Sequence, residues 1–216
     1  MEIEFICPDD AVLQNFPVLP AKRFVPDWYK EMPLDNQEWP TIKHCLPVQD
    51  YITSGYIIQN TYEVTFKRVP SDKAVVHKSS SKSMSYVGGH PFRQFPIEIS
   101  GLTTNYIKIN QPWTIKTPPG YSCLIYQPEY LFEDRFRILP GIVDTDSYDN
   151  PIGLVGYLLK DDVVLSPGEP LVCVMPFKRD DWTARITRDH PSRKSVFQFY
   201  LEKAYRKVFH KKKSFR

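Results

Sequence analysis

The sequence is poor in glycine and contains no long apolar run. It has nine glycines among 216 residues, where the usual share is ~7%. No apolar stretch approaches the ~20 residues that a membrane-spanning helix needs, so we expect no membrane segment. The opening residues, MEIEFICPDD, carry acidic side chains where a secretory signal has basic ones, and we therefore expect a cytosolic protein.

Signatures of common enzymes and metal sites are missing as well. There is no GxSxG, no GxxxxGK[ST] and no GxGxxG. The histidines form no HxH or HxxxH pair, so we expect neither a metal centre nor a bound cofactor. The cysteines form no CxxC pair, and Cys123 and Cys173, which lie in apolar runs, should be buried free thiols. The four cysteines are Cys7, Cys45, Cys123 and Cys173.

Proline is abundant, at 20 of 216 residues, and this density excludes a helical bundle. Apolar residues at 42% and aromatic residues at 14% nevertheless supply a core. Two short helices are expected in the proline-rich amino-terminal part, within residues 25–33 and 45–55, the second closed by Gly55. We expect this part to wrap around the outside of the fold.

After residue 56 the apolar pattern changes to a period of two. Tyr62, Val64 and Phe66 alternate with polar residues, as in a half-buried strand. Turn sequences then separate many short apolar segments, which indicates a mainly β fold, an antiparallel β-barrel or sandwich. The expected strands are 97–100, 105–110, 113–117, 121–127, 136–144, 153–159, 162–165, 170–177 and 183–187.

Charge divides the chain into a body and a tail. Residues 191–216 hold nine Lys/Arg and one acidic residue, a net charge of +8, whereas residues 1–190 carry −5. The tail also has apolar residues at helical spacing on one face. We therefore expect a single β-rich domain over 1–190 and a basic, amphipathic C-terminal helix over 191–216. The apolar face comprises Phe197, Tyr200, Leu201, Ala204 and Val208.

The basic tail has two interpretations. Its helix can dock on the body and leave the lysines in solvent, or the lysines can contact nucleic acid or an acidic partner. The candidate contacts are Arg206, Lys207, Lys211, Lys212 and Lys213.

Residues 118–176 resemble the dUTPase and dCTP deaminase superfamily. The resemblance rests on Pro118–Tyr121 (PPGY), on Gly141–Asp146 (GIVDTD) followed by Tyr148, and on Gly168–Cys173 (GEPLVC). It implies a dUTPase-like barrel in which Asp144 positions the attacking water and Tyr148 recognises the sugar of the nucleotide. A nucleotide hydrolase of this kind would use Asp144, Asp146 and Tyr148, with magnesium.

The same comparison shows a departure at the phosphate site. Where the superfamily has an Arg-Ser pair, this chain has residues 127–130, which include Glu129. Two like charges ~4 Å apart cost on the order of 4 kcal/mol at an effective dielectric of 20, so Glu129 would repel a triphosphate. The phosphate site would then be altered or lost, and the aspartates would simply build a polar hairpin turn.

The whole chain also resembles a family found in tailed phages and some bacterial genomes that has no established activity. The resemblance rests on four segments, AKRFVPDWYKEMP, PWTIKTPPGYSCLI, GIVDTDSYDNP and GEPLVCVMPFKRDDW. It implies a non-catalytic phage accessory or virion-associated protein that binds another protein or a second copy of itself. Such a protein would lie in the host cytoplasm or in the virion.

One local feature, PFKRDDW, places Lys178 and Arg179 before Asp180, Asp181 and Trp182. An exposed Arg179 and Trp182 could bind a partner or stack on a base. The interpretation we favour from sequence is a solvated turn with Trp182 in the core.

Overall fold

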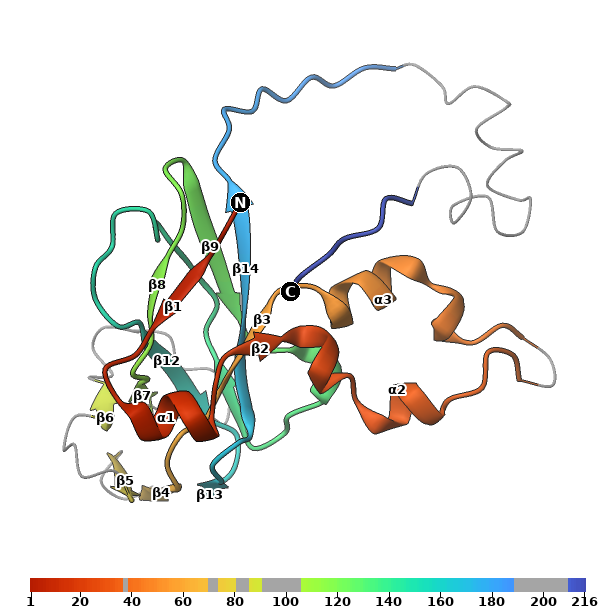
Figure 1. Ribbon diagram of the computed structural model, residues 1–216. Helices are drawn as coiled ribbons and strands as arrows, with labels where there is room; N and C mark the ends of the chain where they lie inside the picture. Colours follow the sequence, from red (N-terminus) through yellow and green to blue (C-terminus); the bar gives the residue numbers. More distant parts are fainter. Residues whose placement is uncertain (37–38, 70–73, 81–85, 91–105, 189–209) are drawn as a thin grey trace.

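A computed structural model describes residues 1–36, 39–69, 74–80, 86–90, 106–188 and 210–216. The fold is mainly β, with antiparallel pairing throughout the described strands and a few short helices (Figure 1). This architecture is consistent with a β sandwich, and no sheet in the described ranges closes into a barrel. None of the described helices has the length and apolar character needed to cross a membrane.

The elements are short, as the frequent prolines and turns predict. The helices are α1 (Asp10–Asn15), η1 (Ala21–Phe24), α2 (Asp27–Glu31), η2 (Ile42–His44), α3 (Leu46–Thr53) and η5 (Glu129–Leu131). The strands are β1 (Glu4–Ile6), β2 (Leu19–Pro20), β3 (Tyr56–Gln59), β4 (Val64–Val69), β5 (Ala74–Ser79), β6 (Val87–His90), β7 (Tyr106–Asn110), β8 (Thr114–Lys116), β9 (Tyr121–Tyr126), β10 (Phe136–Ile138), β11 (Gly141–Val143), β12 (Gly153–Leu158), β13 (Asp162–Leu165) and β14 (Pro170–Lys178).

Four sheets make up the β structure. The largest has the strand order β11-β9-β14-β3-β2, and a second has the order β10-β12-β7-β6. Two smaller sheets are β13-β4-β5 and β1-β8. One apolar core cluster takes side chains from all four, including Ile58, Phe66, Ile109, Ile115 and Leu154. The sheets are therefore held together by a shared core.

The largest sheet is covered on both faces. Val172 and Val174 of β14 belong to the main core, whereas Cys173 between them packs on the other face with Ala21 and Ile57. Burial on both faces explains why β14 is continuously apolar instead of alternating. On the outer face, Ala21 and Phe24 of η1, in the proline-rich amino-terminal part, pack against Ile57 and Cys173.

Gly55 closes α3, also as expected. Its φ is +84°, a conformation that favours glycine, and an added Cβ would lie 2.7 Å from the carbonyl oxygen of Val174. The Ala21 N–H donates to the Gly55 carbonyl at 2.9 Å. Gly55 thus lets the chain leave α3 and pass directly into β3 beside β14.

Two strand predictions are wrong. The segment 136–144 is not one strand: β10 pairs with β12 and β11 pairs with β9, in different sheets. Pro140 lies between them, has no N–H for a ladder bond, and marks the change of sheet. The segment 183–187 forms no strand and is exposed, and Trp182 is 89% exposed instead of lying in the core.

Two further predictions fall wholly or partly outside the described residues. The strand expected over 97–100 lies outside them, as does most of the C-terminal helix expected over 191–216. The part of that helix which is described, residues 210–216, has no helical structure. The other expected strands are confirmed within one or two residues at each end.

Candidate functional site

The aspartates predicted at the candidate site lie in the turn that follows β11. The Asp144 carbonyl accepts hydrogen bonds from the Ser147 N–H at 3.1 Å and the Tyr148 N–H at 2.9 Å, which close the turn. Asx and Ser residues favour such turns, so the local sequence explains the local structure. Asp144, Asp146 and Tyr148 thus share one turn, and their role as a catalytic site stays a prediction.

Both carboxylates are engaged by Arg179, the residue that follows β14. The Arg179 Nη1 lies 3.1 Å from the Asp144 Oδ1, and it donates to the Asp146 Oδ1 at 3.0 Å. The Nη2 also donates to the Asp146 Oδ2. This places a cation beside both acids. A bidentate pair with one carboxylate fixes the guanidinium more firmly than a single contact.

The neighbouring turn supplies further donors. The Ser122 hydroxyl donates to the Asp144 Oδ1 at 2.7 Å, and the Gly120 N–H donates to the Asp146 Oδ2 at 2.9 Å. Hydrogen bonds from Arg179 and then from Gly120 lower the pKa of Asp146 to about 2. Asp146 is therefore a fixed anion, unsuited to exchanging protons near neutral pH.

Asp144 and Tyr148 also line an open hollow of about 510 Å³. Its other lining residues are mostly apolar, among them Ile142, Val143 and Ile152. Tyr148 is partly exposed there, and the Lys116 Nζ donates to its carbonyl oxygen at 3.3 Å. The hollow has room for an aromatic group and offers an acidic rim.

Glu129 does not join this site. It begins η5, beyond the carboxyl end of β9, whereas Ser122 beside Asp144 lies near the start of that strand. At ~3.3 Å per residue the two ends of β9 are well separated. The Glu129 N–H donates to the Tyr51 hydroxyl at 3.5 Å, within an aromatic cluster around α3. Glu129 and the aspartate turn thus belong to different surfaces.

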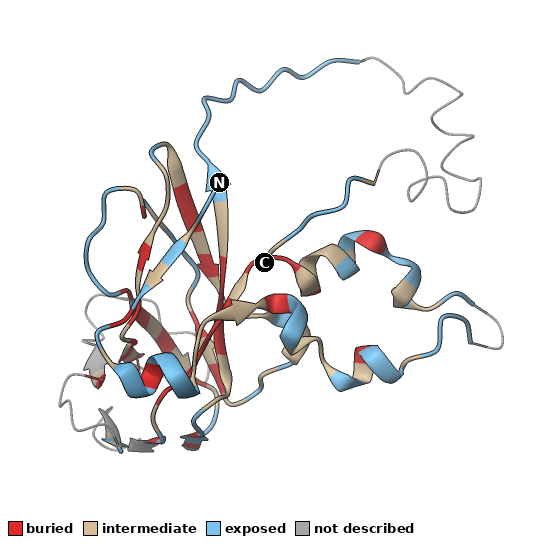
Figure 2. Ribbon diagram, viewed as in Figure 1, coloured by how far each residue is buried: buried red, intermediate tan, exposed pale blue. Residues whose placement is uncertain are grey.

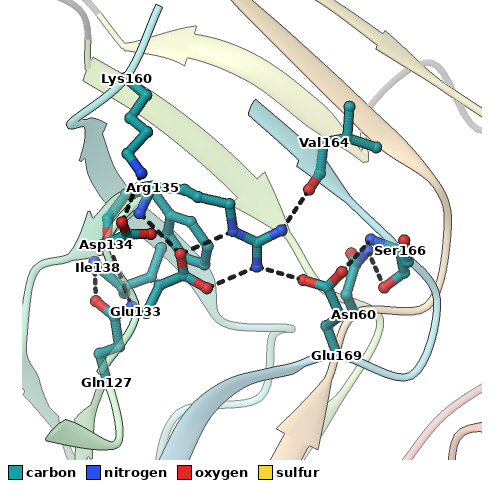
Figure 3. Close-up of polar contacts among 11 residues, drawn as sticks. Asn60, Gln127, Glu133, Asp134, Arg135, Ile138, Lys160, Val164, Ser166 and Glu169 are labelled. Atoms are coloured by element: carbon teal, nitrogen blue, oxygen red, sulfur yellow. Dashed lines mark hydrogen bonds and ion pairs between the residues drawn. The ribbon is translucent and has the colours of Figure 1, made fainter. Parts of the chain in front are cut away.

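A second arginine cluster was missed by the sequence reasoning. The Arg135 guanidinium donates to Glu133 at 2.8 and 2.6 Å, to the Glu169 Oε2 at 2.6 Å, and to the Val164 carbonyl at 2.7 Å (Figure 3). Burial acts to raise the pKa of Glu133, but the Arg135 hydrogen bonds outweigh it, and the pKa is lowered. Glu133 is a near neighbour of Arg135 in the sequence, but only the fold brings Glu169 and Val164 to it, so no sequence motif marks the cluster.

The basic tail returns to the body. Lys213 and His210 contact the Asp50 carboxylate of α3, at 2.5 and 3.2 Å, and the Phe215 ring packs edge-on against Tyr56 at 5.8 Å. Burial acts to raise the pKa of Asp50, but Lys213 and His210 outweigh it and lower it. Lys213 therefore forms an ion pair within its own chain. Nucleic-acid binding through Lys211 and Lys212, which are exposed, stays a prediction.

The remaining candidates in the tail, Arg206 and Lys207, lie outside the described residues. In the part of the chain that the structure describes, no group of three or more His, Cys, Asp or Glu side chains is placed to hold a metal ion. Three cysteines are buried free thiols, including Cys123 and Cys173 as expected, and Cys45 is exposed.

Comparisons with known proteins add little to the geometry described above. No protein-family model matches the chain, and no curated protein matches it. Among solved structures, the chain is similar to the native dUTPase of EIAV, at 11% identity and a TM-score of 0.36, over 63% of this chain and 85% of that one. A similarity this weak carries no argument about the site.

Proposed function

We propose that this chain is a non-catalytic phage accessory or virion-associated protein that acts through protein contacts, in the host cytoplasm or in the virion. The observation that carries the proposal is an exposed apolar turn between α2 and α3, here called the tip (residues 33–42, described except for 37–38). Figure 1 shows α2 and α3 projecting away from the sheets, with the tip at the far end.

The tip presents three apolar side chains to solvent. Leu34, Trp39 and Ile42 are exposed, and Trp39 is 71% exposed. A tryptophan in this position covers no part of the core, so its burial free energy is available to a partner. Trp is among the residue types that most often dominate the binding energy of protein interfaces.

Hydrogen bonds order the described residues of the tip. The Trp39 N–H donates to the Asn36 Oδ1 at 2.7 Å, and the Asn36 N–H donates to the Trp39 carbonyl at 3.1 Å. The Thr41 hydroxyl reaches the Pro33 and Leu34 carbonyls at 2.7 and 2.9 Å. A turn ordered before binding loses little entropy when a partner contacts it.

The base of the tip is also tied together. The Lys43 Nζ donates to the Lys30 carbonyl of α2 at 2.7 Å, and His44 contacts Asp35 at 3.0 Å. These contacts join the segments on either side of the turn. The described residues of the tip therefore form an ordered loop on a β framework, a common way to present recognition residues.

The test compares variants of the full chain as bait in the cells that express it naturally. We expect a protein that the wild type and Val164→Ala capture and that Trp39→Ala does not. With both proteins purified, Trp39→Ala should weaken the Kd about thirtyfold, as for a hot-spot loss of about 2 kcal/mol. Val164 is a matched control because it is an exposed apolar residue on a different surface. Binding that is indifferent to Trp39 would refute the proposal.

A second candidate is a nucleotide hydrolase of the dUTPase or dCTP deaminase kind with an altered phosphate site. The observation that favours it is that Asp144 and Tyr148 line one hollow, with the Asp144 carboxylate largely exposed. Asp144 would position water or hold a magnesium ion, Tyr148 would contact the nucleoside, and the ion would supply positive charge to offset that of the phosphates.

A panel of nucleotides with magnesium distinguishes the two candidates. Turnover that Asp144→Asn abolishes, with the fold intact by circular dichroism, would establish the hydrolase. The matched control is Asp162→Asn, an exposed aspartate on β13. Absence of turnover across the panel would eliminate the hydrolase and leave the protein-contact proposal standing.

A further inference from the structure

The segment that follows β14, here called the arm (residues 180–188), is extended and exposed at every residue (Figure 2). Its base is fixed: the Arg179 N–H donates to the Gly120 carbonyl at 2.8 Å, and the Arg179 guanidinium holds Asp144 and Asp146. The arm therefore leaves the sheet in a defined direction while making no strand pairing of its own.

The arm has the sequence of a strand. Trp182, Ala184 and Ile186 alternate with the polar residues between them, the pattern of a strand with one buried face. Yet Trp182 and Ile186 are 89% and 98% exposed. A β-patterned segment with two large apolar side chains in water is typical of a surface that another chain covers.

An acceptor of matching character lies at the same end of the same sheet. β11 is the terminal strand of the largest sheet, and no described strand pairs with its outer side. Ile142 at its centre is 66% exposed. The hollow of about 510 Å³ beside it is lined by the apolar side chains of Val143, Tyr148 and Ile152 and also by the polar ones of Asp144 and Ser147.

Topology prevents the arm from reaching the acceptor in its own chain while it stays extended. β11 and β14 are both antiparallel to β9 and flank it, so they run in the same direction and end at the same side of the sheet. The arm continues outward past that side, and pairing with its own β11 would need a reversal. A second copy that faces this side of the sheet can bind the arm of the first copy along its β11, while its own arm binds β11 of the first copy. Such an exchange is possible because the arm and β11 lie at the same side of each chain.

We propose that the arm of one copy adds as a strand to the outer edge of β11 in a second copy, with Trp182 and Ile186 seated in the hollow. Backbone hydrogen bonds along the edge would give affinity, and the alternate side chains would give register. The proposal does not depend on the tip or on the function proposed above.

The test uses the full chain and measures its mass in solution by light scattering or sedimentation. The wild type should have a multiple of the 25.3 kDa chain mass. Ile186→Glu in the arm and Ile142→Lys on β11 should each give the monomer. Combining Ile142→Lys with Ile186→Glu in one chain should restore the oligomer, because each arm then brings a glutamate to a lysine.

Val164→Glu is the matched control, because it places a charge on an exposed edge strand elsewhere. It should leave the oligomer intact. A monomeric wild type would overturn the proposal, as would an oligomer that survives either single substitution. Failure of the double variant to reassociate would overturn the pairing of the arm with β11. All five proteins should give the same circular dichroism, since both substituted isoleucines are exposed.

Discussion

Two arginines of this chain each lie between two carboxylates, yet they do different work. Arg135 bridges Glu133 and Glu169, and the Glu133 side chain is only 16% exposed. Arg179 bridges Asp144 and Asp146, and the Asp144 side chain is 63% exposed whereas that of Asp146 is 10% exposed. Water therefore competes for the Arg179–Asp144 pair far more than for either pair of Arg135.

Their positions differ in the same sense. Arg135 contacts the turn before β14 through Glu169 and β13 through the Val164 carbonyl, so it joins segments far apart in the sequence. Arg179 sits where β14 ends, at the base of the arm, and it also contacts distant residues, Asp146 in the turn after β11 and Tyr121 at the start of β9. The comparison teaches that an arginine between two carboxylates can join strands inside the fold or lie at the margin of a sheet, where it contributes less because water reaches it.

The largest expected effect is on Arg135. Replacing it, as Arg135→Met, leaves two partly buried carboxylates facing each other without a cation. We expect the free energy of unfolding to fall by about 2–3 kcal/mol, below the full cost of breaking a buried pair because the cluster is partly solvated. Urea denaturation measures it. Lys160→Met, which removes the exposed partner of Asp134, should change stability much less. Equal effects of the two would contradict the role of burial.

An intermediate effect concerns pH. The folded-state pKa of Glu133 is lowered from its ordinary value of 4.5. Its pairing with Arg135 therefore contributes fully above about pH 4.5 and is lost as the pH falls through the lowered pKa. In Arg135→Met the Glu133 carboxyl is buried without a cation, so protonation relieves it. The stabilities of wild type and variant, measured by urea denaturation, should converge as the pH drops. A difference that stays constant down to about pH 3 would contradict this assignment.

The smallest effect on global stability is expected for Arg179→Met. Arg179 and Asp144 are accessible to solvent and screened by salt, and the cluster lies at the margin of the sheet, so the unfolding midpoint should move little. The arm, however, loses its anchor, and chymotrypsin should cleave after Trp182 several-fold faster. Lys178→Met, which breaks only the exposed contact with Asp180, is the control. A large loss of stability without faster cleavage would make Arg179 a core element and reverse the comparison.

Much of the fold could be predicted from the sequence because its signals are local. The period-two pattern located β4, β7, β9 and β12, and prolines with Gly55 bounded the short helices. The division of 136–144 could have been read from Pro140. The absence of a strand at 183–187 could not be predicted. This segment has the alternating pattern of a strand, and it lacks only a partner strand among the described residues.

The site was predictable only in part for a related reason. Asp144, Asp146 and Tyr148 share one turn, so sequence proximity brings them together. Arg179 joins them through the register of β14 on β9, which sets Lys178 opposite Tyr121. Pairing registers of this kind depend on the whole sheet. The same holds for Arg135 and Glu169, which are 34 positions apart.

The distribution of the thiols has a practical consequence. Cys7, Cys123 and Cys173 are buried, and Cys45 alone among the four is exposed, immediately before α3 and close to the tip. Under native conditions a maleimide dye should therefore attach selectively at this position without any mutagenesis. The emission of a fluorophore at Cys45 should change when a partner binds at Trp39, so this binding can be measured on the protein without any substitution.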